Sequence, residues 1–164
     1  MSIEHTFSRG AVRVVFAYCA ALLFSGFAQA AEPSSWQQCS QALAQNDASS
    51  LAPERRRQCV IAVAGTYLMW VRGELNAADM PLAADFRRRV IGTPRSEATT
   101  DRAALLADTR PDLIASATEQ EWLVEGDTAW AIFTVTLKKS PREIHWIAER
   151  FSLSDGRIRD IMAL

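Results

Sequence analysis

The sequence predicts an α+β fold in which a curved antiparallel sheet packs against helices. Two apolar segments with the alternation of β-strands lie within residues 121–162, and each ends in a tight-turn signal, Gly126-Asp127 or Asp155-Gly156. A segment with helical spacing precedes them. Together these features favour a sheet that wraps around helices, an architecture that can enclose a small molecule.

Two helices are expected ahead of the sheet. Trp36, Cys39 and Leu43 have the spacing of one face of a short helix. A longer helix is expected from Pro53, a residue favoured in the first turn, to about Leu75. Its apolar stripe consists of Val60, Val63, Ala64, Tyr67, Leu68 and Val71.

Short elements then lead to the sheet. A helical turn is expected to end at Asp85, which would act as a cap or turn residue. A short strand is expected over residues 85–91, and its Arg87-Arg88-Arg89 run suits a solvated sheet edge. Thr100 or Asp101 can cap a further short helix.

The first 30 residues have the pattern of a secretory signal peptide. Arg9 and Arg13 precede an apolar run over residues 14–27, which closes on Ala28-Gln29-Ala30. This run of about 14 residues is shorter than the roughly 20 that a membrane-spanning helix needs. We therefore expect cleavage after Ala30, a periplasmic or secreted protein, and no membrane association after cleavage.

The chain beyond residue 30 is long enough for one domain with its own core. We place this domain at residues 53–164, behind a helical extension at residues 31–52. From residue 31 onward the chain keeps 16 of the 18 basic and 18 of the 19 acidic residues, a balance that offers no nucleic-acid footprint. It contains one histidine, His145, and no closely spaced cysteine pair, so we expect no metal site. We also expect no cofactor.

Cys39 and Cys59 remain after processing. An oxidising compartment favours a disulfide between them over two free thiols. Because Cys59 belongs to the long helix, the bond would staple the first helix to the second. Closing a loop of about 20 residues would contribute roughly 3 kcal/mol of stability.

A two-residue turn at Gly126-Asp127 determines which strand residues share a face. The predicted cross-strand pairs are Val124 with Ala129, Trp122 with Ala131, and Gln120 with Phe133. This nearly apolar face should meet the helices. The opposite face carries Trp130 and Ile132 beside threonines. We expect two copies of the chain to associate through this face as a homodimer. The alternative is a monomer with two partly exposed residues.

The orientation of Glu149 depends on the loop at Lys139–Arg142. A four-residue turn there would pair Val135 with Trp146 and point Glu149 outward, whereas an odd-length turn or a bulge would point it inward. We favour the inward orientation. A buried, unpaired carboxylate would be driven toward its neutral form and could donate a hydrogen bond to a ligand. His145 lies about 13 Å away along the strand, too far for an acid/base pair, and is expected at the surface.

Four segments carry a family resemblance by their order and spacing. They are Val63-Ala64-Gly65-Thr66-Tyr67-Leu68, Leu82-Ala83-Ala84-Asp85-Phe86, Trp122-Leu123-Val124-Glu125-Gly126-Asp127 and residues 148–158. With them, about residues 59–163 resemble the SnoaL-like group of the nuclear transport factor two-like superfamily. The resemblance implies a cone-shaped curved antiparallel sheet packed against helices, the cystatin-like or SnoaL-like architecture.

The ketosteroid isomerases share this scaffold, and the resemblance implies candidate residues. Tyr67 is similar in position to the helix tyrosine that polarises a carbonyl, and Glu149 to the carboxylic acid that is kept protonated. The carboxylate that shuttles the proton in those enzymes would fall near Arg89 or Val90, and neither can act as a base. This departure argues against isomerase chemistry.

The leading interpretation is an exported protein that binds a small apolar molecule between sheet and helices, without demonstrated catalysis. The ligand-binding candidates are Tyr67, Trp122, Phe133, Glu149 and Phe151. One alternative is an isomerase, hydratase or cyclase in which Glu149 and Tyr67 are the catalytic candidates. A second alternative is a dimeric structural or interaction module without a functional cavity.

Overall fold

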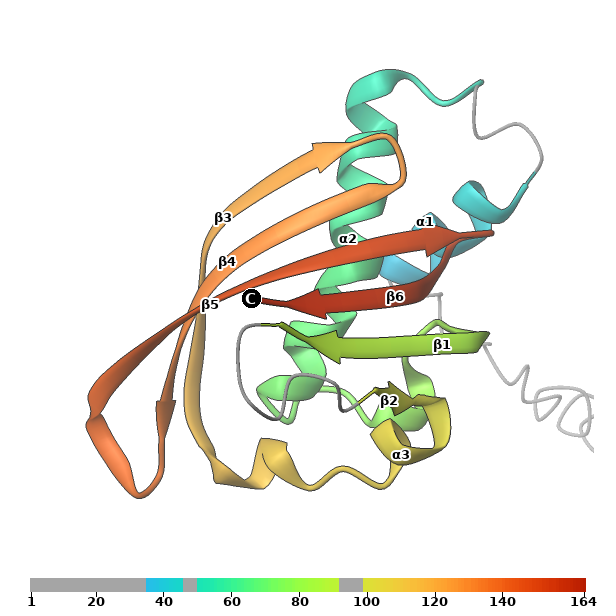
Figure 1. The fold of residues 1–164 in the computed structure, drawn as a ribbon. Helices are drawn as coiled ribbons and strands as arrows, with labels where there is room; N and C mark the ends of the chain where they lie inside the picture. Colours follow the sequence, from blue (N-terminus) through green and yellow to red (C-terminus); the bar gives the residue numbers. More distant parts are fainter. Residues whose placement is uncertain (1–34, 46–49, 92–98) are drawn as a thin grey trace, which may run out of the picture. The chain divides into compact units, whose positions relative to one another are not determined.

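The computed structural model describes residues 35–45, 50–91 and 99–164. Within them, one strongly curved sheet packs against helices, so the predicted α+β class is confirmed (Figure 1). The predicted signal peptide lies outside the described residues. In the described part of the chain, no helix is both long and apolar enough to cross a bilayer.

Six strands form the sheet in the order β2-β1-β6-β5-β4-β3. They are β1 (Leu82–Val90), β2 (Thr100–Asp101), β3 (Ile114–Glu125), β4 (Thr128–Leu137), β5 (Ser140–Ser154) and β6 (Arg157–Ala163). All neighbouring pairs are antiparallel except β1 and β6, which are parallel. The predicted curved sheet is therefore confirmed, with one parallel pair that the sequence did not reveal.

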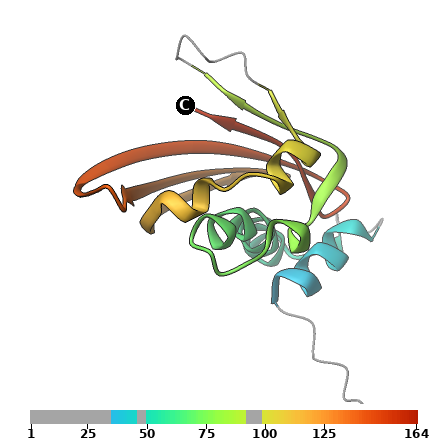
Figure 2. The same ribbon diagram turned by 90° about the horizontal axis from the view of Figure 1, so that it is seen from below.

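Two longer helices lie on the concave side of the sheet, as Figure 2 shows. They are α1 (Ser35–Ala44) and α2 (Pro53–Val71). Helix α2 ends before the expected Leu75, because Gly73 leaves the helical conformation with a φ of 73°. Its buried side chains include every member of the predicted apolar stripe.

Three short helical elements follow α2 in the chain. They are η2 (Ala77–Asp79), α3 (Arg102–Leu106) and η3 (Arg110–Leu113). Asp101 caps α3 as predicted, because its carboxylate accepts a hydrogen bond from the Ala104 amide at 2.8 Å. The last of the three, η3, leads directly into β3.

Strand β1 begins earlier than expected, and two interpretations of this segment are wrong. Asp85 lies inside the strand rather than at a cap, and its carboxylate is 2.8 Å from Arg159 of β6. Alternation along the strand exposes Arg87 and Arg89 but turns Arg88 toward the concave side, where it is buried. The three arginines therefore do not form one solvated run.

The β3–β4 hairpin has the predicted turn, and a β-bulge changes its far half. Two of the three predicted pairs are confirmed, Val124 with Ala129 and Trp122 with Ala131. Beyond the bulge, Phe133 pairs with Glu119, so the predicted pairing with Gln120 is wrong. The extra residue is absorbed by β3, which leaves the inward face of β4 unchanged.

Helix α1 is held at two points. The predicted disulfide joins Cys39 to Cys59 of α2, with their Cα atoms 4.7 Å apart. On the other side, the Ser40 hydroxyl donates a 2.8 Å hydrogen bond to the carbonyl of Gly156 in the β5–β6 turn. Gly156 has a φ of 68°, and a Cβ added there would overlap the Ser40 carbonyl oxygen. The turn therefore packs on the backbone of α1.

This contact predicts unequal effects for two glycine substitutions. Gly126 also has a positive φ, 58°, but a Cβ added there meets nothing within 4 Å. Both Gly→Ala changes carry the backbone cost of roughly 1–2 kcal/mol, and Gly156→Ala adds a clash worth roughly 1–3 kcal/mol. Urea unfolding followed by circular dichroism should show the larger loss for Gly156→Ala. Equal losses would mean that the α1 contact contributes nothing.

Candidate functional site

A cavity of about 260 Å³ lies between α2 and the concave side of the sheet. Side chains from α2, β1, η3, β3, β4 and β5 line it, and nearly all of them are apolar. The lining residues are Tyr67, Trp70, Val71, Arg88, Pro111, Leu113, Ile114, Phe133, Val135, Leu137, Ile147 and Glu149. Its three polar groups, Tyr67, Arg88 and Glu149, contact one another.

Glu149 enters the cavity because of a register shift. A bulge between Val135 and Leu137 places His145, and not Trp146, opposite Val135. Glu149 consequently pairs with Ala131 on the inward face, and only 1% of its surface is exposed. The inward orientation is confirmed, and the alternative of a four-residue turn is wrong.

Among the polar residues that line the cavity, Arg88 is the one that the sequence interpretation missed. Its Nη2 lies 2.7 Å from Oε1 of Glu149, and the two side chains are 10% and 2% exposed. The hydroxyl of Tyr67 donates a longer hydrogen bond, 3.5 Å, to the same oxygen. Because a buried guanidinium favours the ionised carboxylate, the expectation that Glu149 is unpaired and neutral is wrong. Strand alternation from the buried Phe86 was the signal that could have revealed Arg88.

The charge of Arg88 is maintained by its neighbours. Burial by itself would lower the pKa of this guanidinium, because desolvation disfavours a charged group. The interactions with Tyr67 and Glu149, including hydrogen bonds to both, outweigh burial and raise the pKa of Arg88. Its buried Nε meets no hydrogen-bond acceptor among the described residues. Arg88 is therefore a permanent cation in the cavity wall and a donor, not a proton-transfer group.

Two of the predicted ligand-binding residues lie outside this cavity. Phe151 is fully buried, and its ring centroid is 5.6 Å from that of Tyr67 and 5.9 Å from that of Trp122. Trp122 is half-buried and donates its indole N–H to Glu119 at 3.0 Å. The cavity thus brings together Tyr67, Phe133 and Glu149 of the five predicted residues.

His145 lies away from the cavity, as expected. Its imidazole is 45% exposed, and Nε2 is 3.9 Å from Oε2 of Glu143. Across the parts of the chain that the structure describes, no three His, Cys, Asp or Glu side chains cluster as ligands of a metal ion.

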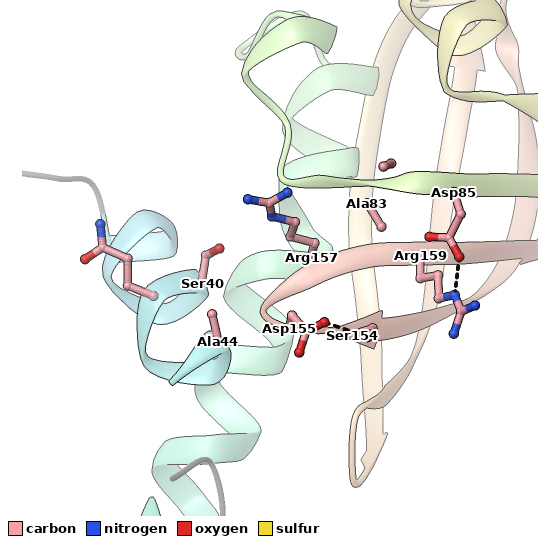
Figure 3. Close-up of a pocket in the computed structure, with 10 residues that line it drawn as sticks. Ser40, Ala44, Ala83, Asp85, Ser154, Asp155, Arg157 and Arg159 are labelled. Carbon is pink, nitrogen blue, oxygen red and sulfur yellow. Dashed lines mark hydrogen bonds and ion pairs between the residues drawn. The ribbon is translucent and has the colours of Figure 1, made fainter. Parts of the chain in front are cut away.

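A second hollow, of about 540 Å³, lies between α1 and the β5–β6 turn (Figure 3). Ser40 and Ala44 line it on the α1 side, and Asp155 lies opposite them at the turn. The ion pair of Asp85 and Arg159 lies at the sheet side. The charged side chains of this hollow are exposed, so it lacks the desolvated polar groups that orient a ligand. The cavity between α2 and the concave side of the sheet, called the cone cavity below, is therefore the better candidate site.

The buried ion pair predicts a stability pattern. Arg88→Met leaves the Glu149 carboxylate buried without its cation, which should lower the free energy of unfolding by roughly 3–5 kcal/mol. Arg88→Met combined with Glu149→Leu removes both charges and should recover most of that loss. Denaturant unfolding of the two variants measures both values. A double variant as unstable as Arg88→Met would show that the loss comes from packing and not from charge.

No protein-family model matches the sequence, and no curated protein matches it. Solved structures do. A protein of unknown function from Burkholderia pseudomallei, described as NTF2-like (nuclear transport factor two-like), has a TM-score of 0.50 and 18% identity, over 66% of this chain and 88% of that one. A steroid delta-isomerase from Pseudomonas aeruginosa has a TM-score of 0.51 and 13% identity, over 64% and 77%.

A de novo designed protein with a curved β-sheet matches with a TM-score of 0.54 and 13% identity, over 69% of this chain and 86% of that one. At such identities the likeness concerns the fold alone, since one fold hosts many activities. The predicted resemblance is confirmed at that level: the chain has the cone fold of nuclear transport factor two-like proteins.

Proposed function

We propose that the cone cavity binds a small, neutral, largely apolar molecule that presents one hydrogen-bond acceptor to Arg88. The observation that supports this function most directly is a single buried ion pair in an otherwise apolar cavity. The cavity volume of about 260 Å³ lies just below the range of drug-sized ligand pockets, which begins at about 300 Å³. A molecule of one or two rings suits that volume.

The preference for a neutral ligand follows from charge balance. Glu149 compensates the charge of Arg88, so an ionised carboxylate entering the cavity would be a buried charge without a counterion. A carbonyl oxygen, in contrast, adds no charge. It could accept a hydrogen bond from guanidinium N–H groups that Glu149 does not engage.

The same contacts argue against proton-transfer catalysis. The enzyme alternative needs Tyr67 and Glu149 to converge on one cavity, and they do. However, a carboxylate bound to a permanent cation at 2.7 Å is a weak base, and Arg88 cannot supply a proton at neutral pH. The similarity to a steroid delta-isomerase keeps this alternative open to test, because fold alone does not decide it.

We also propose that the protein acts outside the cytoplasm, in the periplasm or as a secreted protein. The Cys39–Cys59 disulfide supports this location, because such bonds persist mainly in oxidising compartments. The basic and apolar pattern of residues 1–30 supports it independently.

Three naphthalene probes of similar shape test the ligand class. 2-Acetylnaphthalene offers a neutral acceptor, 2-naphthoic acid an ionised one, and 2-ethylnaphthalene none. Titration followed by tryptophan fluorescence, with Trp70 in the cavity wall, should give the tightest binding for the ketone. Loss of one hydrogen bond to a charged donor should weaken 2-ethylnaphthalene by roughly tenfold or more.

Two substitutions to tryptophan locate the binding site. Val135→Trp places a large side chain in the cavity at a residue outside the ion pair and should abolish binding, whereas Ile132→Trp changes the opposite face of the same strand and should not. Equal affinity for all three probes, or unchanged binding by Val135→Trp, would contradict the proposal.

Proton transfer is tested separately with the same ketone. Its acetyl methyl protons are adjacent to the carbonyl, so a basic Glu149 would exchange them for deuterium in D₂O. We expect the exchange rate, followed by proton NMR, to equal that in buffer, because Arg88 holds the carboxylate. Protein-accelerated exchange that Val135→Trp removes would favour the enzyme alternative.

A further inference from the structure

The side of α2 that faces away from the cone cavity is apolar and only partly covered. No charged residue lies between Arg57 and Arg72, so the helix is uncharged on every side over this stretch. Helices that are apolar all round are typically buried on all sides. On this side of α2, however, Ile61, Gly65 and Met69 are partly exposed. This surface therefore has the composition of a buried one, and the described residues leave it partly open.

The open side of α2 contributes to a groove of about 330 Å³. Two tryptophans from neighbouring elements, Trp36 of α1 and Trp122 of β3, also line it. The Cys39–Cys59 disulfide fixes α1 beside α2 at this place. This α1–α2 groove is defined by Trp36, Ile61, Gly65, Met69, Arg72 and Trp122. It shares no lining residue with the cone cavity, whose α2 residues are Tyr67, Trp70 and Val71.

Gly65 is unusual because the fold itself does not require a glycine there. Glycine weakens the interior of a helix more than any other residue except proline. A Cβ added to Gly65 would meet no atom within 4 Å, so contacts among the described residues do not explain the choice. A glycine on an open surface lets a ligand approach the backbone closely. Gly65 therefore indicates that a bound molecule contacts α2 in this groove.

The dimensions of the α1–α2 groove fit a single extended chain. From Ile61 to Arg72 its α2 side is about 16 Å long, at about 1.5 Å per residue. A volume of about 330 Å³ over this length leaves a mean cross-section of about 20 Å². An α-helix with its side chains, about 10–12 Å in diameter, has a cross-section several times larger. The groove is therefore too narrow for a partner helix and wide enough for an extended peptide.

Charge complementarity favours an uncharged occupant. The two charged side chains that line the groove, Arg72 and Glu119, form an ion pair at 3.2 Å. Arg72 also contacts Glu74 at 2.9 Å. At the other end of this stretch of α2, Arg57 lies 3.9 Å from Glu54. A charged ligand would have to compete with these pairs, whereas a neutral one leaves them intact.

The aromatic lining indicates which kind of extended chain fits. Polyproline II segments dock into grooves lined by aromatic side chains, and they lose little conformational entropy because they are already extended. Trp36 and Trp122 are both partly exposed and provide such a lining. The carbonyl groups of a polyproline II chain make no internal hydrogen bonds, so an indole N–H such as that of Trp36 can donate to one of them.

We propose that the α1–α2 groove binds an uncharged, proline-rich segment of another protein in the polyproline II conformation. At about 3.1 Å per residue, the groove accommodates about five residues of such a segment. The segment lies along α2, crosses the backbone at Gly65 and contacts the two tryptophans. This inference does not depend on what the cone cavity binds.

NMR of the ¹⁵N-labelled protein, purified after export, tests the proposal with acetylated hexaproline. The peptide should shift the indole N–H signals of Trp36 and Trp122, which Trp→Phe variants assign. The signals of Trp130 and Trp146 come from the other face of the sheet and should not move. A glycine-serine peptide of the same length is flexible and should have no effect at the same concentration.

A substitution at Gly65 separates binding from stability. Gly65→Leu places a side chain in the groove and should weaken hexaproline binding by roughly tenfold or more. It should not lower the melting temperature, because the site has room and leucine is the better helix former. Gln58→Leu adds the same side chain on α2 outside the groove and should leave binding unchanged.

Three results would overturn the proposal. In the first, the Trp36 and Trp122 signals do not move, or both peptides move them equally. In the second, Gly65→Leu binds hexaproline as tightly as the wild type, which would place the peptide elsewhere. In the third, raising the protein concentration alone shifts the same two signals, which would assign the groove to a second copy of the chain.

Discussion

The buried ion pair between Arg88 and Glu149 is the interaction on which the interior of this protein depends. It joins β1 to β5, which are not neighbours in the sheet because β6 lies between them. Through Tyr67 it also reaches α2. Two desolvated charges are costly unless their geometry is maintained. One polar cluster therefore links β1, β5 and α2, and the proposed preference for a neutral ligand rests on it.

The end of the cone near α1 is fixed by different means. The Cys39–Cys59 bond ties α1 to α2, and Gly156 lets the β5–β6 turn approach the α1 backbone. These contacts lie away from the cavity, whose lining comes from α2, η3 and the sheet.

The two faces of the sheet differ because side chains alternate along each strand. In β1, Arg88 faces the cavity while Arg87 and Arg89 face outward, so three consecutive arginines divide between a buried ion pair and a charged surface. In β4, Phe133 lines the cavity while Trp130 and Ile132 lie on the convex face. Substitutions at adjacent positions can therefore change the cavity and the convex face separately.

Local patterns predicted much of the fold. The apolar stripe of α2, the Asp101 cap, the turn at Gly126-Asp127 and the two pairs beside it depend on residues close in sequence, and the structure confirms them. The disulfide could also be predicted, because only two cysteines remain beyond residue 30. The Gln120 pairing failed because a bulge adds one residue to β3, and no local signal marked it.

The candidate site was predicted only in part, for a physical reason. Tyr67, Phe133 and Glu149 could be proposed from helical spacing, strand alternation and family resemblance. The ionised state of Glu149 could not, because its cation lies 61 residues away in a strand that reaches it only when the sheet forms. The sequence by itself determined the order of the elements, their apolar faces and the disulfide. Only the tertiary structure decided the register of β5, and with it the burial of Glu149 opposite Arg88, because a one-residue shift in pairing exchanges the two faces of a strand.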